Sequence, residues 1–322
     1  MIPDVFSSGG SVEPGRPARN LASIFSRRPR ITRRRLRENI TGWLFVAPVF
    51  VWALVFTAYP LVSSLRLSFY EWNPFGTNLF IGLANYRELL HDRVFILAYK
   101  NALYYAALGI PAGLVWGIAV ALAVQNIRGR AFFRALFFLP TVTSSAAIGI
   151  FWSWIYQRDY GLLNGLLQMI GIDGPNWLGN TSWAMPSVVI VVIWAGTGYW
   201  MVIFLAALLD IPPEFVEAAQ IDGASGWQVF RHITLPLLSP AIFYYLTSAL
   251  ITVWSQFDLV YVMTGGGPAN ATLMPAVHLY REAWTQLRMG YASAMAWVMA
   301  LVIFALTALH FGLARKWVHY GR

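Results

Sequence analysis

The sequence predicts an all-α membrane protein with six spanning helices. Hydrophobic residues make up 58% of the 322 residues and charged residues only 11%, whereas a soluble domain carries about 25% charged residues. So few charges cannot cover a water-facing surface, and most of the surface must therefore face lipid. Long stretches without Asp, Glu, Lys or Arg recur along the chain. They are expected to be helices, because lipid offers no partner for open backbone groups and a barrel would show short alternating segments.

Six stretches are long enough to cross a bilayer, which takes about 20 mostly apolar residues. The predicted spans are residues 43–62, 102–124, 135–156, 183–209, 237–257 and 292–314. The chain contains no Cys, which excludes a disulfide scaffold and a Cys-ligated metal site.

Residues 1–40 form a polar, Arg-rich arm before the spanning domain of residues 41–322. Most of the 23 Lys and Arg lie on the arm's side of the membrane, and the positive-inside rule then places both termini in the cytoplasm. The arm is not a signal peptide, since the first apolar run is long enough to span. It lacks the interleaved aromatic residues typical of a nucleic-acid arm. We expect it to bind anionic membrane lipid and no nucleic acid.

Motifs for catalysis and nucleotide binding are absent from the sequence. The only lysines are Lys100, followed by Asn101, and Lys316, followed by Trp317, so no Walker A loop is present. The five His residues lie in different segments and none pair at metal-ligand spacing. The prediction is a transport subunit rather than an enzyme, with no cofactor or metal of its own.

Residues 211–236, here called the elbow, are too long and too patterned for a simple connection between spans. Pro212 and Pro213 suit the start of a helix, and Glu214 and Glu217 are placed in its first turn, where the helix dipole favours acids. Asp222-Gly223 then ends this helix. Ser225 is predicted to cap a second short helix ending at Phe230 or Arg231. The pattern alone fits equally a helix pair lying on the membrane and a knob that docks into a partner protein.

The elbow contains Glu217-Ala218-Ala219, Gly223, Ile233 and Leu235-Pro236 at fixed spacing. This string resembles the EAA loop of ABC importer permeases. Other segments are similar to the carbohydrate branch of that family, the maltose and glycerol-phosphate type. These segments are Ile81-Gly82-Leu83-Ala84-Asn85-Tyr86, Phe138-Leu139-Pro140, Ile221-Asp222-Gly223-Ala224-Ser225, Phe257-Asp258 and Thr264-Gly265-Gly266-Gly267-Pro268. The resemblance covers residue 40 to the C-terminus.

The resemblance implies a six-helix permease in the cytoplasmic membrane that imports a sugar or oligosaccharide by alternating access. A second, homologous permease would complete a heterodimer. Two ATPase subunits would bind ATP and Mg²⁺, and an extracytoplasmic binding protein would deliver the solute. The elbow would be the cytoplasmic coupling element. Its coupling residues would be Glu217, Ala218, Ala219, Asp222 and Gly223.

Solute contacts are expected on spans four and five, where polar residues cost energy in lipid and so usually face a cavity. The positions that match solute contacts of maltose-type relatives are Gly196 and Tyr199, with Thr252, Val253 and Gln256. Aromatic faces beside hydroxyl and amide groups suit a sugar. For any one of these residues, bonding between helices is the competing interpretation. Asp258, near the end of its span, is assigned a structural role.

Two other functions compete with sugar import. One is an ABC permease for a non-sugar solute such as a polyamine or phosphate, which the aromatic content of spans four and five disfavours. The other is a self-contained channel or secondary transporter. A secondary transporter would need a charged relay inside the membrane, and the spans hold almost no ionisable groups.

Overall fold

The computed structural model describes residues 33–76, 78–315 and 317–318, and side chains from residue 40 onward. Most of the predicted arm therefore lies outside the described residues. The chain divides into two units, residues 1–60 and 61–322. Helix α1 (Arg33–Ala53), a π-helical turn (Leu54–Ala58) and the first two residues of the next helix make up the described part of the first unit.

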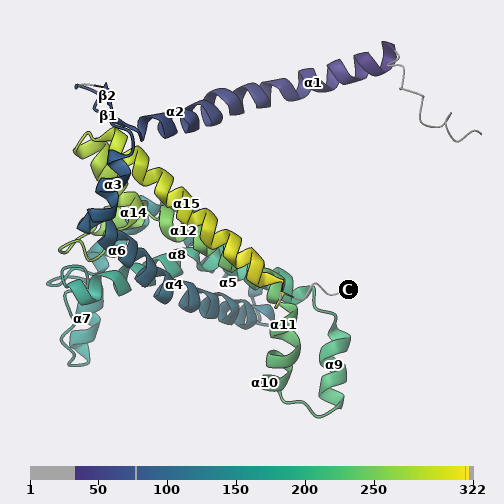
Figure 1. The fold of residues 1–322 in the computed structure, drawn as a ribbon. Coiled ribbons are helices and arrows are strands. Elements are labelled where there is room, and N and C mark those ends of the chain that lie inside the picture. Colours follow the sequence, from purple (N-terminus) through teal and green to yellow (C-terminus); the bar gives the residue numbers. More distant parts are fainter. Residues whose placement is uncertain (1–32, 77, 316, 319–322) are drawn as a thin grey trace, which may run out of the picture. The chain divides into compact units, whose positions relative to one another are not determined.

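The second unit is built mainly of helices (Figure 1). In chain order the helices after α1 are α2 (Tyr59–Leu67, which begins in the first unit), α3 (Ala84–His91), α4 (Arg93–Gln125), α5 (Arg130–Phe138), η3 (Leu139–Val142), α6 (Ser145–Ile155), α7 (Leu162–Met169), α8 (Thr181–Leu209), α9 (Pro213–Ile221), α10 (Gly226–Val229), η4 (Phe230–Thr234), α11 (Leu235–Leu237), α12 (Ser239–Ser255), α13 (Asp258–Met263), α14 (Pro275–Tyr280), η5 (Arg281–Thr285) and α15 (Met289–Ala314). A hairpin of β1 (Tyr70–Trp72) and β2 (Asn78–Phe80), which the sequence did not predict, follows α2 and pairs Tyr70 with Phe80.

Four helices are long and apolar enough to cross a membrane, and two bent helix pairs bring the number of candidate spans to six. The four straight spans are Ile40–Leu67, Arg93–Gln125, Thr181–Leu209 and Met289–Ala314. The six predicted spans are thus confirmed in number. Span three was predicted as a continuous helix, and this prediction was wrong. Predicted span five, residues 237–257, contains the continuous helix Ser239–Ser255, and the bend of this pair lies at its start.

Span three bends by 100° between Arg130–Val142 and Ser145–Ile155. Pro140 lies in the short 3₁₀ turn before the bend, and Ser144 adopts an extended conformation before α6 begins. Proline has no N–H to donate to the preceding turn, and sharp bends in helices usually have such a cause.

Span five bends by 63° between Gly226–Leu237 and Ser239–Ser255. The bend lies between two prolines, Pro236 and Pro240, whose missing N–H groups interrupt the ladder of hydrogen bonds on either side. The helix also ends earlier than predicted, because Gln256 has a ψ of 111° and is extended. Gln256 and Phe257 therefore form a break between α12 and α13.

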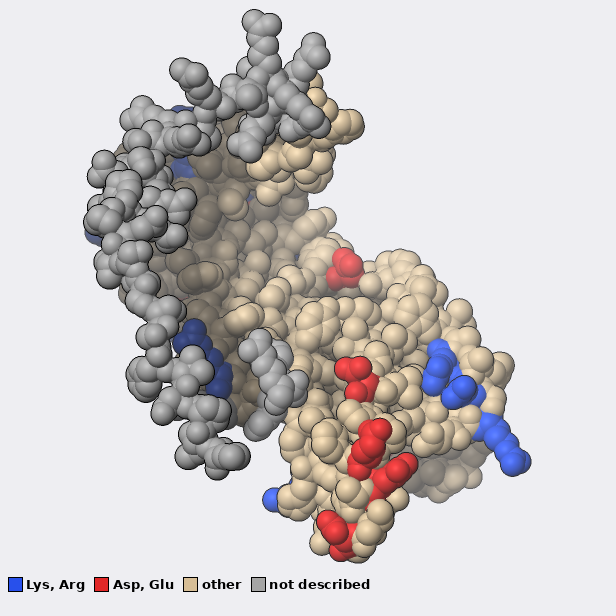
Figure 2. All heavy atoms as spheres, turned by 90° about the vertical axis from the view of Figure 1, so that its right-hand side faces the viewer, with Lys and Arg blue, Asp and Glu red and all other residues tan. Residues whose placement is uncertain are grey.

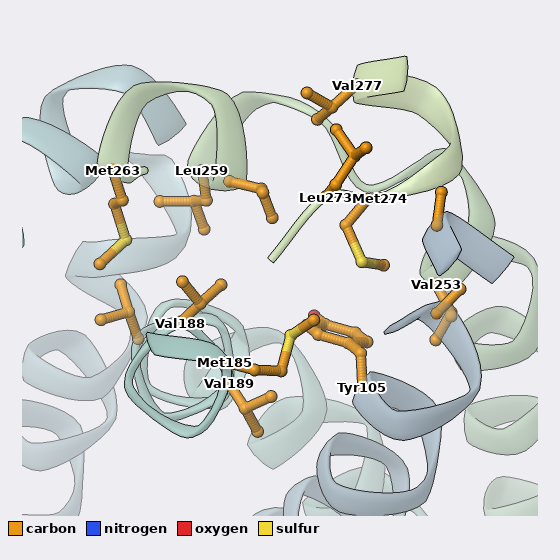
Figure 3. Packing of buried hydrophobic residues seen from close by; sticks show 14 of the residues in the cluster. Tyr105, Met185, Val188, Val189, Val253, Leu259, Met263, Leu273, Met274 and Val277 are labelled. Carbon is orange, nitrogen blue, oxygen red and sulfur yellow. The ribbon is translucent and has the colours of Figure 1, made fainter. Parts of the chain in front are cut away.

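A buried apolar cluster packs α4 and α8 against the segment that follows span five (Figure 3). Tyr105 from α4, Met185 and Val189 from α8, and Leu259 and Met263 from α13 belong to this cluster. Beyond α13, Leu273, Met274 and Val277 close the cluster, and each is fully buried. Short connecting helices thus pack against the same end of both spans.

Asp92 joins the start of α4 to the start of α15. Its Oδ1 accepts hydrogen bonds from the backbone N–H groups of Val94 and Phe95, 2.7 and 3.2 Å away, and so caps α4. Its Oδ2 accepts the hydroxyl of Tyr291 at 2.6 Å and lies 3.6 Å from Nε2 of the buried His278. Two helices that are distant in the sequence are held together by one carboxylate.

The surroundings shift the pKa of both acid–base groups in this junction. Burial lowers the pKa of His278 below its ordinary value, and the cation of Arg281 lowers it further. The nearby carboxylates of Glu282 and Asp92 raise this pKa, but by less than burial lowers it. Burial would raise the pKa of Asp92, but the hydrogen bonds from Tyr291 and the α4 backbone, with His278, lower it overall. At neutral pH the junction thus pairs a carboxylate with a neutral imidazole.

Acidification is expected to destabilise this junction through His278. A histidine whose pKa is lower in the folded state binds its proton more tightly when unfolded, so stability falls as pH drops below about 6.5. The loss cannot exceed about 1.4 kcal/mol per pH unit for one proton. The lowered pKa of Asp92 affects stability only in the more acidic range below about pH 4.

Thermal unfolding of the purified protein between pH 7.5 and 5.5 tests this expectation. The Tm of the wild type should fall more steeply with acid than the Tm of His278→Gln, which removes the titrating ring. The exposed His91→Gln is the matched control and should keep the wild-type slope. Equal slopes for the wild type and His278→Gln would show that His278 does not control the acid response.

Candidate functional site

The first helix of the elbow forms where the sequence predicts it. Helix α9 begins at Pro213, with Glu214 in its first turn, and ends at Ile221. Glu217 lies in the second turn rather than in the first, so the prediction for this residue was wrong. Glu217 is exposed and makes no hydrogen bond or ion pair with any residue in the described part of the chain.

Gly223 makes the turn at the centre of the elbow. It has a φ of +82°, a conformation that side-chain-bearing residues rarely adopt. The N–H of Gly223 donates to the carbonyl of Gln220 at 3.1 Å, and the N–H of Ala224 donates to the carbonyl of Ala219 at 2.9 Å. These two bonds form a Schellman motif, which satisfies carbonyls at the end of a helix. The turn between the helices therefore has one defined geometry.

The second helix of the elbow begins at a capping box. Oγ of Ser225 accepts the N–H of Gln228 at 3.4 Å, and Oε1 of Gln228 accepts the N–H of Ser225 at 2.7 Å. The predicted cap is confirmed, but the predicted end at Phe230 or Arg231 was wrong. Helical structure continues through η4 and α11 to Leu237 and then bends into α12. The elbow is therefore joined to α12 by helical structure with a single bend of 63° before Ser239.

The elbow projects from one end of the second unit (Figure 1). It carries both apolar and acidic side chains. Ile221 and Trp227 are 87% and 67% exposed, and Trp227 stacks on Phe230 with ring centroids 5.5 Å apart. Acidic side chains gather over this end of the molecule (Figure 2). The acidic residues of α9 and its two flanks are Asp210, Glu214, Glu217 and Asp222. Of the predicted coupling residues, only Ala219 is partly covered, and Glu217, Ala218, Asp222 and Gly223 are exposed.

Three of the five predicted solute residues lie around one cavity. Gly196 from α8 and Thr252 and Val253 from α12 line a space of about 100 Å³ together with residues of α4. Oγ1 of Thr252 donates to the carbonyl of Ser248 in its own helix at 2.8 Å. Pockets for small ligands typically measure 300–1,000 Å³. In this conformation the cavity is too small to enclose a sugar.

Tyr199 and Gln256, the other two predicted solute residues, lie outside this cavity. The hydroxyl of Tyr199 is 2.7 Å from the hydroxyl of Tyr244 on α12. Gln256 lies in the break after α12 and is partly buried. Asp258 starts α13 and is exposed. The Gly-rich loop that follows is held by Asn101, whose side-chain amide donates to the carbonyls of Asn270 and Leu273.

Polar groups outside the five predicted solute residues also surround the cavity. Nε1 of Trp116 donates to Oγ1 of Thr197 at 3.0 Å, which joins α4 to α8. The hydroxyl of Tyr245 donates to the carbonyl of Ile110 at 2.9 Å, which joins α12 to α4. Within the described ranges, no group of three or more His, Cys, Asp or Glu could hold a metal ion.

Comparison with known proteins agrees with this architecture. The model of the family "Binding-protein-dependent transport system inner membrane component" matches residues 109–319. The chain is 36% identical to "Probable ABC transporter permease protein YesP" of Bacillus subtilis, over 88% of this chain and 93% of that protein. It is 35% identical to "Lactose transport system permease protein LacF" of Rhizobium radiobacter, over 86% and 95%. It is 32% identical to "Diacetylchitobiose uptake system permease protein NgcF" of Streptomyces coelicolor, over 90% and 89%.

A solved structure has the same fold. A chain of a bacterial ABC transporter described as importing the acidic polysaccharide alginate superposes with a TM-score of 0.77 at 25% identity, covering 88% of this chain and 99% of that chain. The family model covers more than half of the chain, and the relatives align with nearly all of it. This protein belongs to the family of inner membrane components of binding-protein-dependent transport systems.

Proposed function

We propose that this multi-pass permease of the inner membrane imports a sugar or oligosaccharide as part of an ATP-driven ABC importer. Relatives that align over most of the chain are named for lactose, diacetylchitobiose and starch degradation products, and this observation carries the proposal. The complete importer comprises this chain, a second homologous permease, two ATPase subunits and an extracytoplasmic solute-binding protein. The family description and the names of the relatives support this composition.

The elbow is the coupling element in this proposal. Its exposed apolar and acidic side chains, Trp227 and Glu217 among them, fit into a cleft of one ATPase subunit. ATP and Mg²⁺ belong to the ATPases, because this chain has no lysine in a phosphate-binding loop. When the ATPases close around ATP, the fixed turn at Gly223 transmits the movement through α10 and α11 into span five. Repeated closing and opening alternates access to the two sides of the membrane.

The solute path follows α8 and α12. Gly196 gives a sugar ring close access to the backbone of α8, and the hydroxyls of Tyr199 and Thr252 bond to sugar hydroxyls. Val253 provides an apolar wall, and Gln256 adds an amide at the break after α12. The cavity must widen to admit the solute. Separation of α8 from α12 or movement of the second permease provides that widening.

The elbow and both termini are placed on the cytoplasmic side, where the ATPases are. The basic residues of the arm support this orientation, since cytoplasmic segments are enriched in Lys and Arg. Residues 1–40 serve as an anchor on anionic lipid, and residues 41–322 form the permease domain.

Solute-stimulated ATPase activity of the reconstituted complex tests the sugar proposal. We expect a neutral saccharide, supplied with the binding protein, to raise ATP hydrolysis severalfold, because solute binding favours the state that the ATPases close. A panel of mono- and oligosaccharides is compared with a polyamine and inorganic phosphate under identical conditions. If only the polyamine or phosphate stimulated ATP hydrolysis, the transported solute would belong to that class and would not be a sugar. Solute flux in the absence of ATP would show that the protein is a channel or secondary transporter and not part of an ATP-driven importer.

A further inference from the structure

Two tyrosines connect the helices on either side of the elbow. Tyr199 belongs to α8, which leads into the elbow, and Tyr244 belongs to α12, which leaves it. Their hydroxyl oxygens are 2.7 Å apart, and either hydroxyl can be the donor. The two residues are separated by 45 positions in the sequence, and the whole elbow lies between them. This contact therefore closes a ring that consists of α8, the elbow and α12.

The pair lies level with the elbow-side end of the cavity, whose lining includes the adjacent residues Trp200 and Tyr245. Tyr199 is ten residues, or about 15 Å of helix, from the last residue of α8, and Tyr244 is five residues, or about 7 Å, from the first residue of α12. Gly196 and Thr252, which line the cavity, lie farther from the elbow on the same two helices. The seam between α8 and α12 is thus joined at the elbow-side end of the cavity.

The neighbouring aromatic residues support the pair from one side only. The ring of Trp200 lies 4.8 Å from Tyr199 and 6.0 Å from Tyr244, measured between ring centroids. The other side of both tyrosines is open, with 40% of Tyr199 and 45% of Tyr244 exposed. By contrast, the adjacent Tyr245 is buried, and its hydroxyl is bound to backbone of α4. The bond between Tyr199 and Tyr244 lies at the surface of this chain, whereas Tyr245 is buried.

Neutral hydroxyls suit a contact that must form and break repeatedly. Each phenol can donate or accept, and a solute hydroxyl or a water molecule can replace either partner without leaving a buried charge. A fixed structural contact in the membrane would be expected among buried groups, as is the bond of Tyr245. The exposure of both partners indicates a contact that can be exchanged.

We propose that Tyr244 is a positioning residue for transport: its hydroxyl holds that of Tyr199 and keeps the seam between α8 and α12 closed at the elbow-side end of the cavity. Movement of the elbow drives the two helices apart and breaks the contact, which frees the Tyr199 hydroxyl for the solute. The proposal rests on the proposed coupling role of the elbow and adds Tyr244 to the residues of the solute path. The contact between the two tyrosines resists the separation of α8 from α12 whether or not a solute is present.

The test is the basal ATPase activity of the complete importer in liposomes, measured without solute and without binding protein. Tyr244→Phe keeps the ring and removes only the hydroxyl. We expect it to raise basal hydrolysis about threefold, the effect of one average hydrogen bond between spanning helices on an equilibrium. Tyr199→Phe should give a similar rise. The double variant should resemble either single variant, because both changes remove the same bond.

Tyr104→Phe is the matched control, since Tyr104 is 47% exposed on α4 and its hydroxyl makes no hydrogen bond within the described part of the chain. This variant should hydrolyse ATP at the wild-type basal rate. Unchanged basal activity in Tyr244→Phe, or rises that multiply in the double variant, would overturn the proposal. Because no solute is present, this outcome is independent of which solute stimulates the importer, and the two proposals can fail separately.

Discussion

Replacing Gly223 with Asp is expected to leave the importer assembled while ATP hydrolysis no longer drives uptake. A Cβ at this position would meet no other atom within 4 Å, so the folded elbow has space for the side chain. The cost is the left-handed conformation at φ +82°, about 1–2 kcal/mol for a residue with a side chain. The new carboxylate also lies next to Asp222 on an already acidic elbow. We expect uptake to fall roughly tenfold or more, in the range of usual coupling energies.

Two measurements on the same reconstituted sample separate coupling from assembly. Size-exclusion chromatography of the purified complex should show the full set of subunits, and ATPase activity should persist, while solute uptake per ATP hydrolysed should drop. Gly171→Asp is the matched control. Gly171 has a φ of +77° and follows α7, away from the elbow, and a Cβ at this position would likewise meet no other atom within 4 Å. This variant should transport at nearly the wild-type ratio.

Gly223→Asn distinguishes the shape of the turn from its charge. Asparagine is close in size to aspartate, is neutral and tolerates the left-handed conformation better than most residues. We therefore expect Gly223→Asn to retain much more coupling than Gly223→Asp. Intact uptake in Gly223→Asp would count against docking of the elbow, and loss of the assembled complex would show that Gly223 serves folding instead.

The elbow could be predicted closely because its determinants are local. A proline at the first helical position, a glycine after the last one and a serine followed by a glutamine three residues later each act within one turn of helix. Only the turn of α9 that holds Glu217 and the end of the second helix were misplaced. Nothing local stops it at Phe230 or Arg231, and the first strong interruption is the bend between Pro236 and Pro240.

The spans were predictable in number but not in shape. Hydropathy measures whether a segment prefers lipid, and it does not register a change of direction inside that segment. Pro140 was a visible signal for the bend in span three, but an X-Pro site in a membrane helix can also be tolerated with little bending. The bend of 100° depends on how α5 packs against α8, which is a tertiary contact.

The candidate solute residues were only partly brought together for the same reason. Gly196, Thr252 and Val253 meet at one cavity, which residues of α4, α8 and α12 line together. Gln256 was expected within a helix and instead occupies its end, and no pattern in the sequence indicates that α12 stops at Ser255. The partner of Tyr199 could not be found from the sequence, since Tyr244 and Tyr245 are equivalent in composition and differ only in the side of α12 that they occupy.

Substitution of Gly198 by Ala is expected to give a large loss of stability in the membrane domain. A Cβ at Gly198 would lie 2.5 Å from the carbonyl oxygen of Phe137 and 2.5 Å from Cα of Phe138. Both are backbone atoms at the end of α5, and backbone cannot move aside as a flexible side chain can. Relief requires the end of α5 and the following turn to shift away from α8, and overpacking of this kind costs about 1–3 kcal/mol or more.

The thermal midpoint and the yield of monodisperse complex measure this effect. We expect Gly198→Ala to lower the Tm by several degrees, at roughly 2–4 °C per kcal/mol for a chain of this size class. Gly109→Ala is the matched control on α4, because its Cβ would meet only side chains at 3.7 and 3.8 Å, which is ordinary contact. Alanine favours helix more than glycine does, so this control should be neutral or slightly stabilising. If Gly198→Ala were as stable as Gly109→Ala, α5 would not pack on α8 as closely as its backbone atoms indicate, and the bend of span three would lose the contact that holds it.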